Sequence, residues 1–144
     1  MNISENEIRA IVEQVAARLA AASGMQRTVD KSGIISIKTD TVRCEPFMQQ
    51  GVRLKDVVSL EEALRMGCGI MELDAGTSFA WTLDYDEYDL VLTGTLEIEI
   101  ENRTVTGGPG DIILIPKGSS IRFKSPDSVR YAYFVYPADW QSQS

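Results

Sequence analysis

The sequence contains no histidine, and this absence removes several kinds of chemistry at once. A serine or cysteine nucleophile has no imidazole to activate it, and the common histidine ligands of transition metals are missing. Cysteine is also scarce, because only Cys44 and Cys68 occur. Two irregularly placed cysteines make neither a disulfide framework nor a zinc site, so we expect both to be reduced and packed as small apolar residues.

Other absences exclude whole classes of partner. No apolar run approaches the ~20 residues that cross a bilayer, and the N-terminus lacks the basic start and apolar core of a signal peptide. The net charge of −7 argues against a nucleic-acid surface, which needs clustered Lys and Arg. The Gly-rich segment 107–110 lacks the Lys-Ser/Thr pair of a phosphate-binding loop. We therefore expect a cytoplasmic protein with neither a membrane nor a nucleic-acid partner.

The 144 residues are enough for one compact domain with a short appendage. Residues 1–22 predict an amphipathic helix that begins with a Ser4–Glu7 capping box. Its apolar stripe needs a packing partner, which is either the domain, a sister subunit or another protein. Residues 23–33 are polar and predict a linker, and residues 34–144 form the domain. The stripe consists of Ile8, Ile11, Val12, Val15 and Leu19.

The domain has the pattern of short β-strands separated by tight turns. Residues 96–101 alternate apolar and glutamate side chains, which predicts one buried and one solvated strand face. Residues 112–115 are apolar throughout, as in a strand buried on both faces. Residues 40–53 contain Pro46 and Gly51 and predict irregular cover. The predicted fold class is all-β, a sandwich or small barrel.

Two spacings within the domain resemble the paired motifs of the cupin barrel. In the first, Glu87 is followed by six residues and Gly94; in the second, Gly110 precedes Pro116 and Gly118. Metal-binding cupins add three histidines to these motifs. In the alternative registers, the two histidine positions of the first motif fall among residues 80–84, and the third falls on Ile121. Only Glu87 remains of the four usual ligands, so we predict no metal site.

The nearby carboxylates offer a second possible metal site for a hard cation. Along an extended strand, however, Asp84 and Asp86 point away from Glu87 and Asp89. We therefore favour a solvated acidic turn with one or two inward carboxylates.

The inward positions are aromatic and acidic, which is the composition of either a small-ligand pocket or an ordinary core. A carboxylate walled by aromatic rings has a raised pKa and can act as a general acid or base, and Glu87 is the candidate for this catalytic role. Lys117 is a candidate anion contact in the turn beside Ser119. The predicted substrate-binding residues are Trp81, Tyr85, Asp89, Ser119, Tyr131 and Tyr133, with Phe123 on the same inward face.

Three segments, FAWTLDYDEYDLVLTGTLEIEI, RTVTGGPGDIILIPKGSSIRF and YPADW, resemble the C-terminal domain of the ethanolamine-utilisation family EutQ. The resemblance runs from about Val42 to Trp140. It implies a cupin barrel, a double-stranded β-helix or jelly roll, and a homodimer encoded with the enzymes of bacterial microcompartments. It also implies acetate kinase activity with Mg-ATP or Mg-ADP, although the longer members carry a larger N-terminal region.

Two functions remain open from the sequence. The first is an accessory, binding or scaffold protein of the microcompartment, with a metal-free pocket and no tightly bound cofactor. The second is an acetate kinase that interconverts acetyl phosphate plus ADP and acetate plus ATP. The N-terminal helix resembles peptides that direct cargo into microcompartments, so residues 1–22 are the expected contact with shell or cargo proteins.

Overall fold

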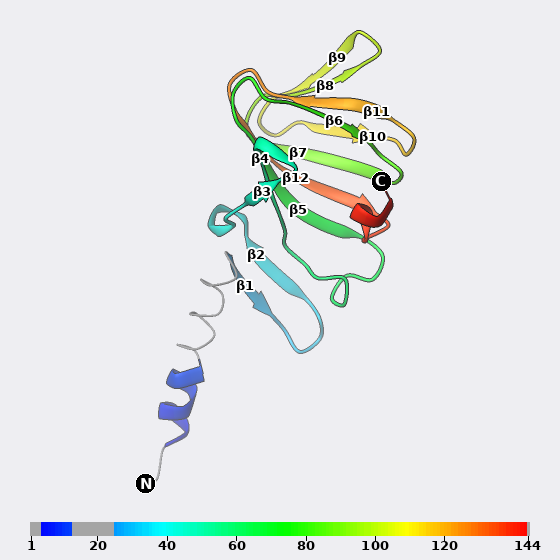
Figure 1. Ribbon diagram of the computed structural model, residues 1–144. Helices are drawn as coiled ribbons and strands as arrows, with labels where there is room; N and C mark the ends of the chain where they lie inside the picture. Colours follow the sequence, from blue (N-terminus) through cyan, green and yellow to red (C-terminus); the bar gives the residue numbers. More distant parts are fainter. Residues whose placement is uncertain (1–3, 13–24, 144) are drawn as a thin grey trace. The chain divides into compact units, whose positions relative to one another are not determined.

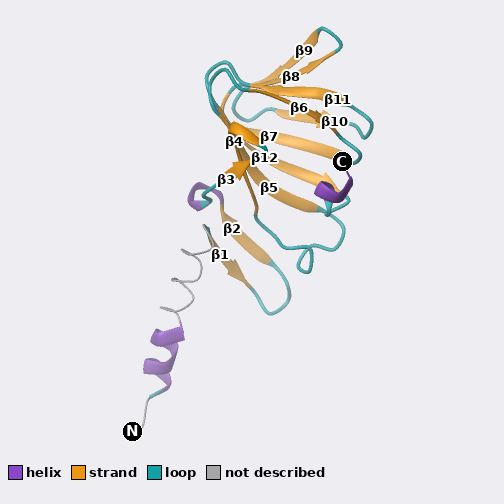
Figure 2. Cartoon of the chain, in the orientation of Figure 1, coloured by secondary structure: helices purple, strands orange, loops and turns teal. Residues whose placement is uncertain are grey.

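The computed structural model describes residues 4–12 and 25–143 of the chain (Figure 1). It divides into two compact units, Met1–Arg43 and Cys44–Ser144. Strands dominate the second unit (Figure 2), so the all-β prediction is confirmed. No helix in the described ranges has the length and apolar character needed to span a membrane.

The first unit contains a helix and a hairpin. Residues 5–12 are helical, and the predicted capping box is present: Glu7 N donates to Ser4 Oγ at 3.2 Å and Ser4 N donates to Glu7 Oε2 at 3.0 Å. Ile8, Ile11 and Val12 are exposed. Val15 and Leu19, the rest of the predicted stripe, lie outside the described residues.

The hairpin lies partly where the sequence predicts a linker. Strand β1 (Gln26–Val29) pairs antiparallel with β2 (Ile35–Lys38), and the 3₁₀ turn η1 (Thr39–Thr41) follows. The connection closes because Gly33, at φ +97°, donates its N–H to the carbonyl of Asp30 at 2.9 Å. Residues 26–29 form the first strand of this hairpin, and they lack the apolar alternation that marks a buried strand.

The second unit is built from two antiparallel sheets. The six-stranded sheet has the order β10-β7-β12-β5-β4-β3, and the four-stranded sheet has the order β6-β11-β8-β9. The strands are β3 (Glu45–Phe47), β4 (Gln49–Asp56), β5 (Gly67–Leu73), β6 (Ser78–Thr82), β7 (Asp86–Gly94), β8 (Leu96–Ile100), β9 (Arg103–Gly107), β10 (Ile112–Ile115), β11 (Ser120–Lys124) and β12 (Val129–Tyr136); η2 (Trp140–Gln143) ends the chain.

Side-chain alternation places the core between the two sheets. Along β7, Glu87, Asp89 and Val91 are buried, whereas Asp86 and Tyr88 are exposed. The predicted β8–β9 hairpin is confirmed, with Leu96 and Ile98 buried. Its two-residue turn has positive φ at Glu101 (47°) and Asn102 (65°), the geometry that matches the twist of paired strands.

Two segments differ from their predicted conformations. Within residues 40–53, the expected irregular cover is instead β3 and the first part of β4, and a register shift after Pro46 interrupts their pairing. This shift explains why the segment lacks a regular alternation. Strand β10 is buried on one face only, because Ile112 is 67% exposed and Leu114 is 52% exposed. It is an edge strand of the six-stranded sheet, and no other described residue covers that face.

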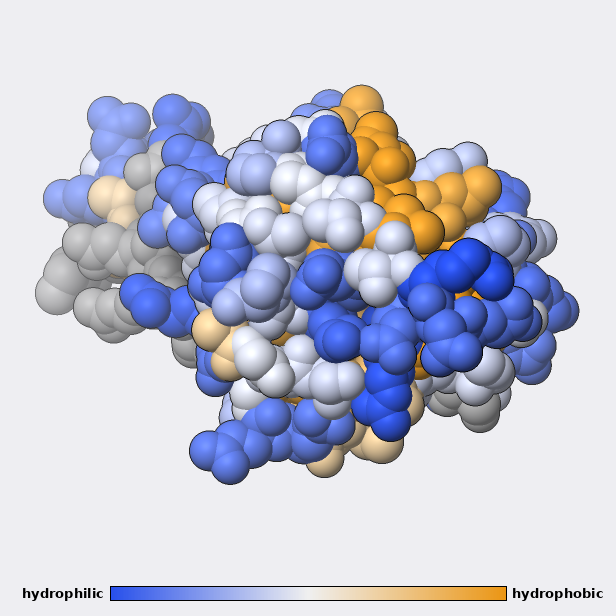
Figure 3. Space-filling view, turned by 90° about the horizontal axis from the view of Figure 1, so that it is seen from above, coloured by the Kyte–Doolittle hydropathy of each residue, from blue (hydrophilic) through white to orange (hydrophobic). Residues whose placement is uncertain are grey.

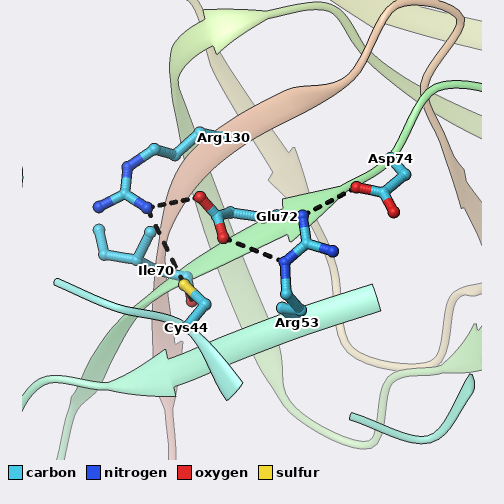
Figure 4. Close-up of polar contacts among 6 residues, drawn as sticks. All are labelled: Cys44, Arg53, Ile70, Glu72, Asp74 and Arg130. Carbon is cyan, nitrogen blue, oxygen red and sulfur yellow. Dashed lines mark hydrogen bonds and ion pairs between the residues drawn. The ribbon is translucent and has the colours of Figure 1, made fainter. Parts of the chain in front are cut away.

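A row of charged side chains crosses neighbouring strands of the six-stranded sheet (Figure 4). Glu72 on β5 forms an ion pair with Arg53 of β4 at 3.3 Å and another with Arg130 of β12 at 2.8 Å. Arg53 also pairs with Asp74 at 2.8 Å. Cys44 lies beside this row, and burial, followed by the charge of Glu72, raises the pKa of its thiol to about 11. Both cysteines are free, as predicted.

Candidate functional site

The interior of the second unit holds a cavity of about 20 Å³. This volume accommodates about one water molecule. Residues from both sheets line the cavity, together with Trp140 from the C-terminal η2 turn. The lining residues are Phe47, Leu54, Met71, Phe79, Trp81, Tyr85, Glu87, Phe123, Tyr133 and Trp140.

Aromatic rings fill most of the space around this cavity. Trp140 contacts Trp81 and Tyr85 with ring centroids 5.9 Å apart, and Tyr133 at 5.8 Å. Phe123 stacks on Tyr131 at 6.1 Å. Such pairs stabilise a core beyond the area that they bury. The predicted inward aromatic set is therefore a continuous packed cluster.

Polar atoms of these aromatic residues are paired with one another or with Asp56. Trp81 Nε1 donates to Tyr85 Oη at 2.7 Å. Asp56 Oδ1 accepts from Tyr133 Oη at 2.5 Å and from Trp140 Nε1 at 3.2 Å. Burial, with a further contribution from nearby carboxylates, raises the pKa of both Tyr85 and Tyr133. These hydroxyls remain protonated near neutral pH; that of Tyr133 donates to Asp56, and that of Tyr85 accepts from Trp81.

Glu87 and Asp89 form a buried pair of carboxyl groups on the inner face of β7. Glu87 is 5% exposed and Asp89 is fully buried. Burial raises the pKa of Glu87 to about 7. Burial, and then the charge of Glu87, raises the pKa of Asp89 well above its usual value. Two adjacent buried carboxyls cannot both ionise at low cost.

The hydrogen bonding of Asp89 agrees with a protonated pair. Among the described residues, neither Asp89 oxygen accepts a hydrogen bond from a conventional donor. The carboxyl of Glu87 is adjacent, however, and a proton held between the two groups makes one of them a donor to the other. The pair is thus suited to retaining a proton at neutral pH, rather than to binding a cation.

The residues present do not match the metal site that the fold family usually carries. Leu83 is fully buried and Ile121 is 6% exposed, so apolar side chains occupy candidate histidine positions. In the described part of the chain, no three His, Cys, Asp or Glu side chains gather in a metal-binding arrangement. Asp84 and Asp86 point outward, where Asp84 lies 3.9 Å from Lys117 Nζ and Asp86 accepts the Lys117 N–H at 2.9 Å.

The structure gathers most predicted site residues but separates one. Trp81, Tyr85, Glu87 and Tyr133 line the cavity. Asp89 and Tyr131 lie in the same core, where Tyr131 Oη donates to Met71 Sδ at 2.7 Å. Ser119 instead lies in the turn before β11, and its hydroxyl donates to the Pro116 carbonyl at 2.7 Å.

Sequence reasoning did not identify Trp140 as part of this interior, or Asp56 as the exposed carboxylate that accepts a hydrogen bond from it. Asp56 ends β4, and its bonds to Tyr133 and Trp140 join residues 77 and 84 positions apart, which local sequence pattern does not show. Trp140 follows the last strand on a short turn. Its available signals were its aromatic character and its place in the segment YPADW.

The family model of the ethanolamine utilisation protein EutQ matches residues 2–142. The chain is 43% identical over 150 residues to "Acetate kinase EutQ" of Clostridioides difficile (strain 630), covering 99% of this chain and 95% of that protein. The C. difficile EutQ structure aligns with a TM-score of 0.79 and 47% identity, covering 84% of this chain and 93% of that one.

Two further comparisons extend this result. "Acetate kinase EutQ" of Salmonella typhimurium is 46% identical over 91 residues, which are 63% of this chain and 39% of that longer protein. The Cupin_2 domain of an XRE-family regulator from Enterobacter cloacae aligns with a TM-score of 0.53 at 18% identity, covering 60% of this chain and 97% of that domain, and shows the fold alone. The predicted cupin fold is confirmed, and the chain belongs to the EutQ family of ethanolamine-utilisation proteins.

Proposed function

We propose that this EutQ-family cupin is an acetate kinase, which interconverts acetyl phosphate plus ADP and acetate plus ATP during ethanolamine utilisation. One observation carries the proposal: the C. difficile relative named acetate kinase matches 99% of this chain and 95% of its own length. A relative of nearly the same extent carries the name. The larger region of the longer Salmonella relative is therefore no argument against kinase activity in this chain.

The proposed reaction needs little covalent help from the protein. A terminal phosphate oxygen of ADP attacks the phosphorus of acetyl phosphate, the bond from phosphorus to the acyl oxygen breaks, and that oxygen leaves as acetate. The attacking oxygen is already ionised at neutral pH, so no proton is removed. Positioning and charge stabilisation then supply the catalysis, with Mg²⁺ arriving on the nucleotide rather than as a tightly bound metal. A general base at Glu87 is not required by this step.

The size of the interior cavity supports a reaction outside the aromatic core. About 20 Å³ is far below the ~300 Å³ at which small-molecule sites begin. We therefore assign the core, including Glu87 and Trp140, a structural role. The enzyme is expected to work in the cytoplasm or within a microcompartment.

A second candidate function is an accessory or scaffold protein of the microcompartment. It is supported by the exposed apolar side chains Ile8, Ile11 and Val12 on the capped N-terminal helix. Partner grooves bind helices through apolar anchors at this spacing.

A homodimer is part of either proposal. The apolar composition of residues 112–115 indicates a strand buried on both faces, yet Ile112 and Leu114 are exposed in the single chain. Tyr88, opposite Leu114 on β7, is also exposed. Apolar side chains gather along one side of the molecular surface in Figure 3. A second copy of the chain packed on this face buries these exposed apolar side chains and protects the edge strand β10.

ATP formation from acetyl phosphate and Mg-ADP by the purified chain tests the kinase proposal directly. Turnover supports it. No turnover, together with recruitment to assembled compartments, supports the scaffold function instead.

A further inference from the structure

A hollow of about 330 Å³ lies on the outer face of the four-stranded sheet, and Trp81 lines both this hollow and the interior cavity. Its volume is within the range of small-molecule sites, about 300–1,000 Å³. It opens between β6, β11 and the β8–β9 turn. The lining residues are Ala80, Trp81, Thr82, Glu99, Glu101, Asn102, Ser120, Ile121 and Arg122.

The pairing of β6 with β11 explains both the space in this outer face and the polar side chains around it. Arg122 on β11 lies opposite Ala80 on β6, and Ser120 lies opposite Thr82. Residues two apart on a strand share a face, so these four side chains make one outward patch. The short side chain of Ala80 leaves space beside the guanidinium. The hydroxyls of Thr82 and Ser120 lie 3.0 Å apart at the other end of the patch.

Arg122 is available to an anion, although its charge, after the larger effect of Lys124, also helps to lower the pKa of Glu99. Glu99, which lies opposite Arg122 on β8, is bound by Lys124 Nζ at 2.9 Å. Arg122 Nη1 donates to the neutral hydroxyl of Ser78 at 3.1 Å. Within residues 4–12 and 25–143, no carboxylate forms an ion pair with the Arg122 guanidinium. This is notable in a chain with 21 acidic and 14 basic residues.

The donors around the hollow match the acceptors of a phosphate group. A guanidinium forms paired, charge-assisted hydrogen bonds with phosphate oxygens. The hydroxyls of Thr82 and Ser120 and the amide of Asn102 supply further donors on the same surface. Glu99 and Glu101 at the rim are paired with Lys124 at 2.9 Å and with Arg103 at 3.3 Å.

We propose that this hollow binds a phosphate group of the kinase substrates, through Arg122 and the Thr82–Ser120 hydroxyl pair. The site deepens the proposed function and depends on it for the identity of the ligand. ADP and acetyl phosphate both present phosphate oxygens to such a site. Separate titrations therefore distinguish the two sources of the phosphate.

The test uses the full chain, Arg122→Gln, and the matched control Arg65→Gln, which removes the same charge from an exposed loop outside the hollow. Calorimetric titrations with Mg-ADP and with inorganic phosphate measure binding. Steady-state assays measure KM separately for ADP and for acetyl phosphate. Circular dichroism checks that the exposed substitutions leave the fold intact.

We expect Arg122→Gln to weaken binding by about tenfold or more, since it removes a charged hydrogen-bond donor, while Arg65→Gln binds as the wild type does. A raised KM for ADP alone assigns the hollow to the nucleotide, and a raised KM for acetyl phosphate alone assigns it to the acyl donor. Unchanged binding in Arg122→Gln overturns the site, as does a wild-type chain that binds neither probe. Phosphate binding that depends on Arg122 without any turnover preserves the site and refutes the kinase.

Discussion

Burial of Glu87 and Asp89 on one face of β7 makes the stability of the folded chain depend on pH. The pKa of Glu87 is about 7 and that of Asp89 is raised well above 3.8, so the native state holds protons that the unfolded chain releases first. The free energy of unfolding should therefore fall as the pH rises from about 4 through 7 and beyond. The slope is about 1.4 kcal/mol per pH unit for each retained proton. Because the chain has no histidine, the slope is clearest above about pH 5, where the ordinary carboxylates have already ionised.

Asp89→Asn should reduce this slope by about half, because it removes one of the two proton-retaining groups. Urea unfolding monitored by tryptophan fluorescence from pH 5 to pH 8 measures the effect. Asp84→Asn is the matched control, since Asp84 is exposed and its loss should leave the slope unchanged. Wild-type stability that is flat or rises over this range would show that the pair is not protonated in the native state.

The glycines of the two motifs make different demands on the backbone. Gly94 has φ +79°, and a Cβ there would lie 1.8 Å from the carbonyl oxygen of Ser128. Gly110 has φ +88° but open space around the same position. Gly94→Ala should destabilise the fold by about 3 kcal/mol or more, through strain and a backbone clash, and Gly110→Ala by about 1–2 kcal/mol. Equal losses in denaturant unfolding would contradict this distinction.

At the scale of elements, the parts readable from sequence are those with a clear two-residue alternation. The faces of β7 and the β8–β9 hairpin follow from Glu87, Asp89, Leu96 and Ile98, which are all buried as predicted. The interior aromatic set is readable for the same reason.

The remaining elements depend on contacts that local pattern does not encode. Asp56 points to Tyr133 and Trp140 only after β4, β12 and the C-terminal turn have assembled. Strand β2 alternates apolar and polar residues, but its partner β1 is short and polar and leaves no such signature. The hollow around Arg122 arises from cross-strand register with Ala80, which links residues more than 40 positions apart.

The N-terminal helix is expected to dock onto shell or cargo proteins rather than to stabilise the cupin unit. Deleting residues 1–24 should leave the Tm nearly unchanged, because the two units separate after Arg43. Fusing those residues to a fluorescent protein should direct it to assembled compartments. Ile11→Glu should abolish targeting, since it places a charge on the exposed apolar side, whereas Arg9→Glu provides a control with a charge change at a polar position. A large loss of stability on deletion, or a diffuse fusion, would assign the helix to the fold.

At the scale of the whole molecule, the exposed apolar residues of β10 predict self-association. Light scattering at micromolar concentration should give twice the 15.9 kDa chain mass. Leu114→Lys should shift the molecule towards the monomer, because it places a charge on the face proposed to be covered. Val105→Lys tests the same change at another exposed strand position, on β9, and should leave the dimer intact. A wild-type monomer at that concentration would contradict the proposed interface.

The most direct test of the account is steady-state ATP formation from acetyl phosphate and ADP, with and without Mg²⁺, by the full chain. The kinase proposal predicts turnover that requires Mg²⁺, co-elutes with the protein through size-exclusion chromatography and is absent from a mock preparation. Persistent turnover in Glu87→Gln would agree with a reaction that needs no base in the core. A folded, assembled protein with no Mg²⁺-dependent turnover above the mock preparation would contradict the assignment as an acetate kinase.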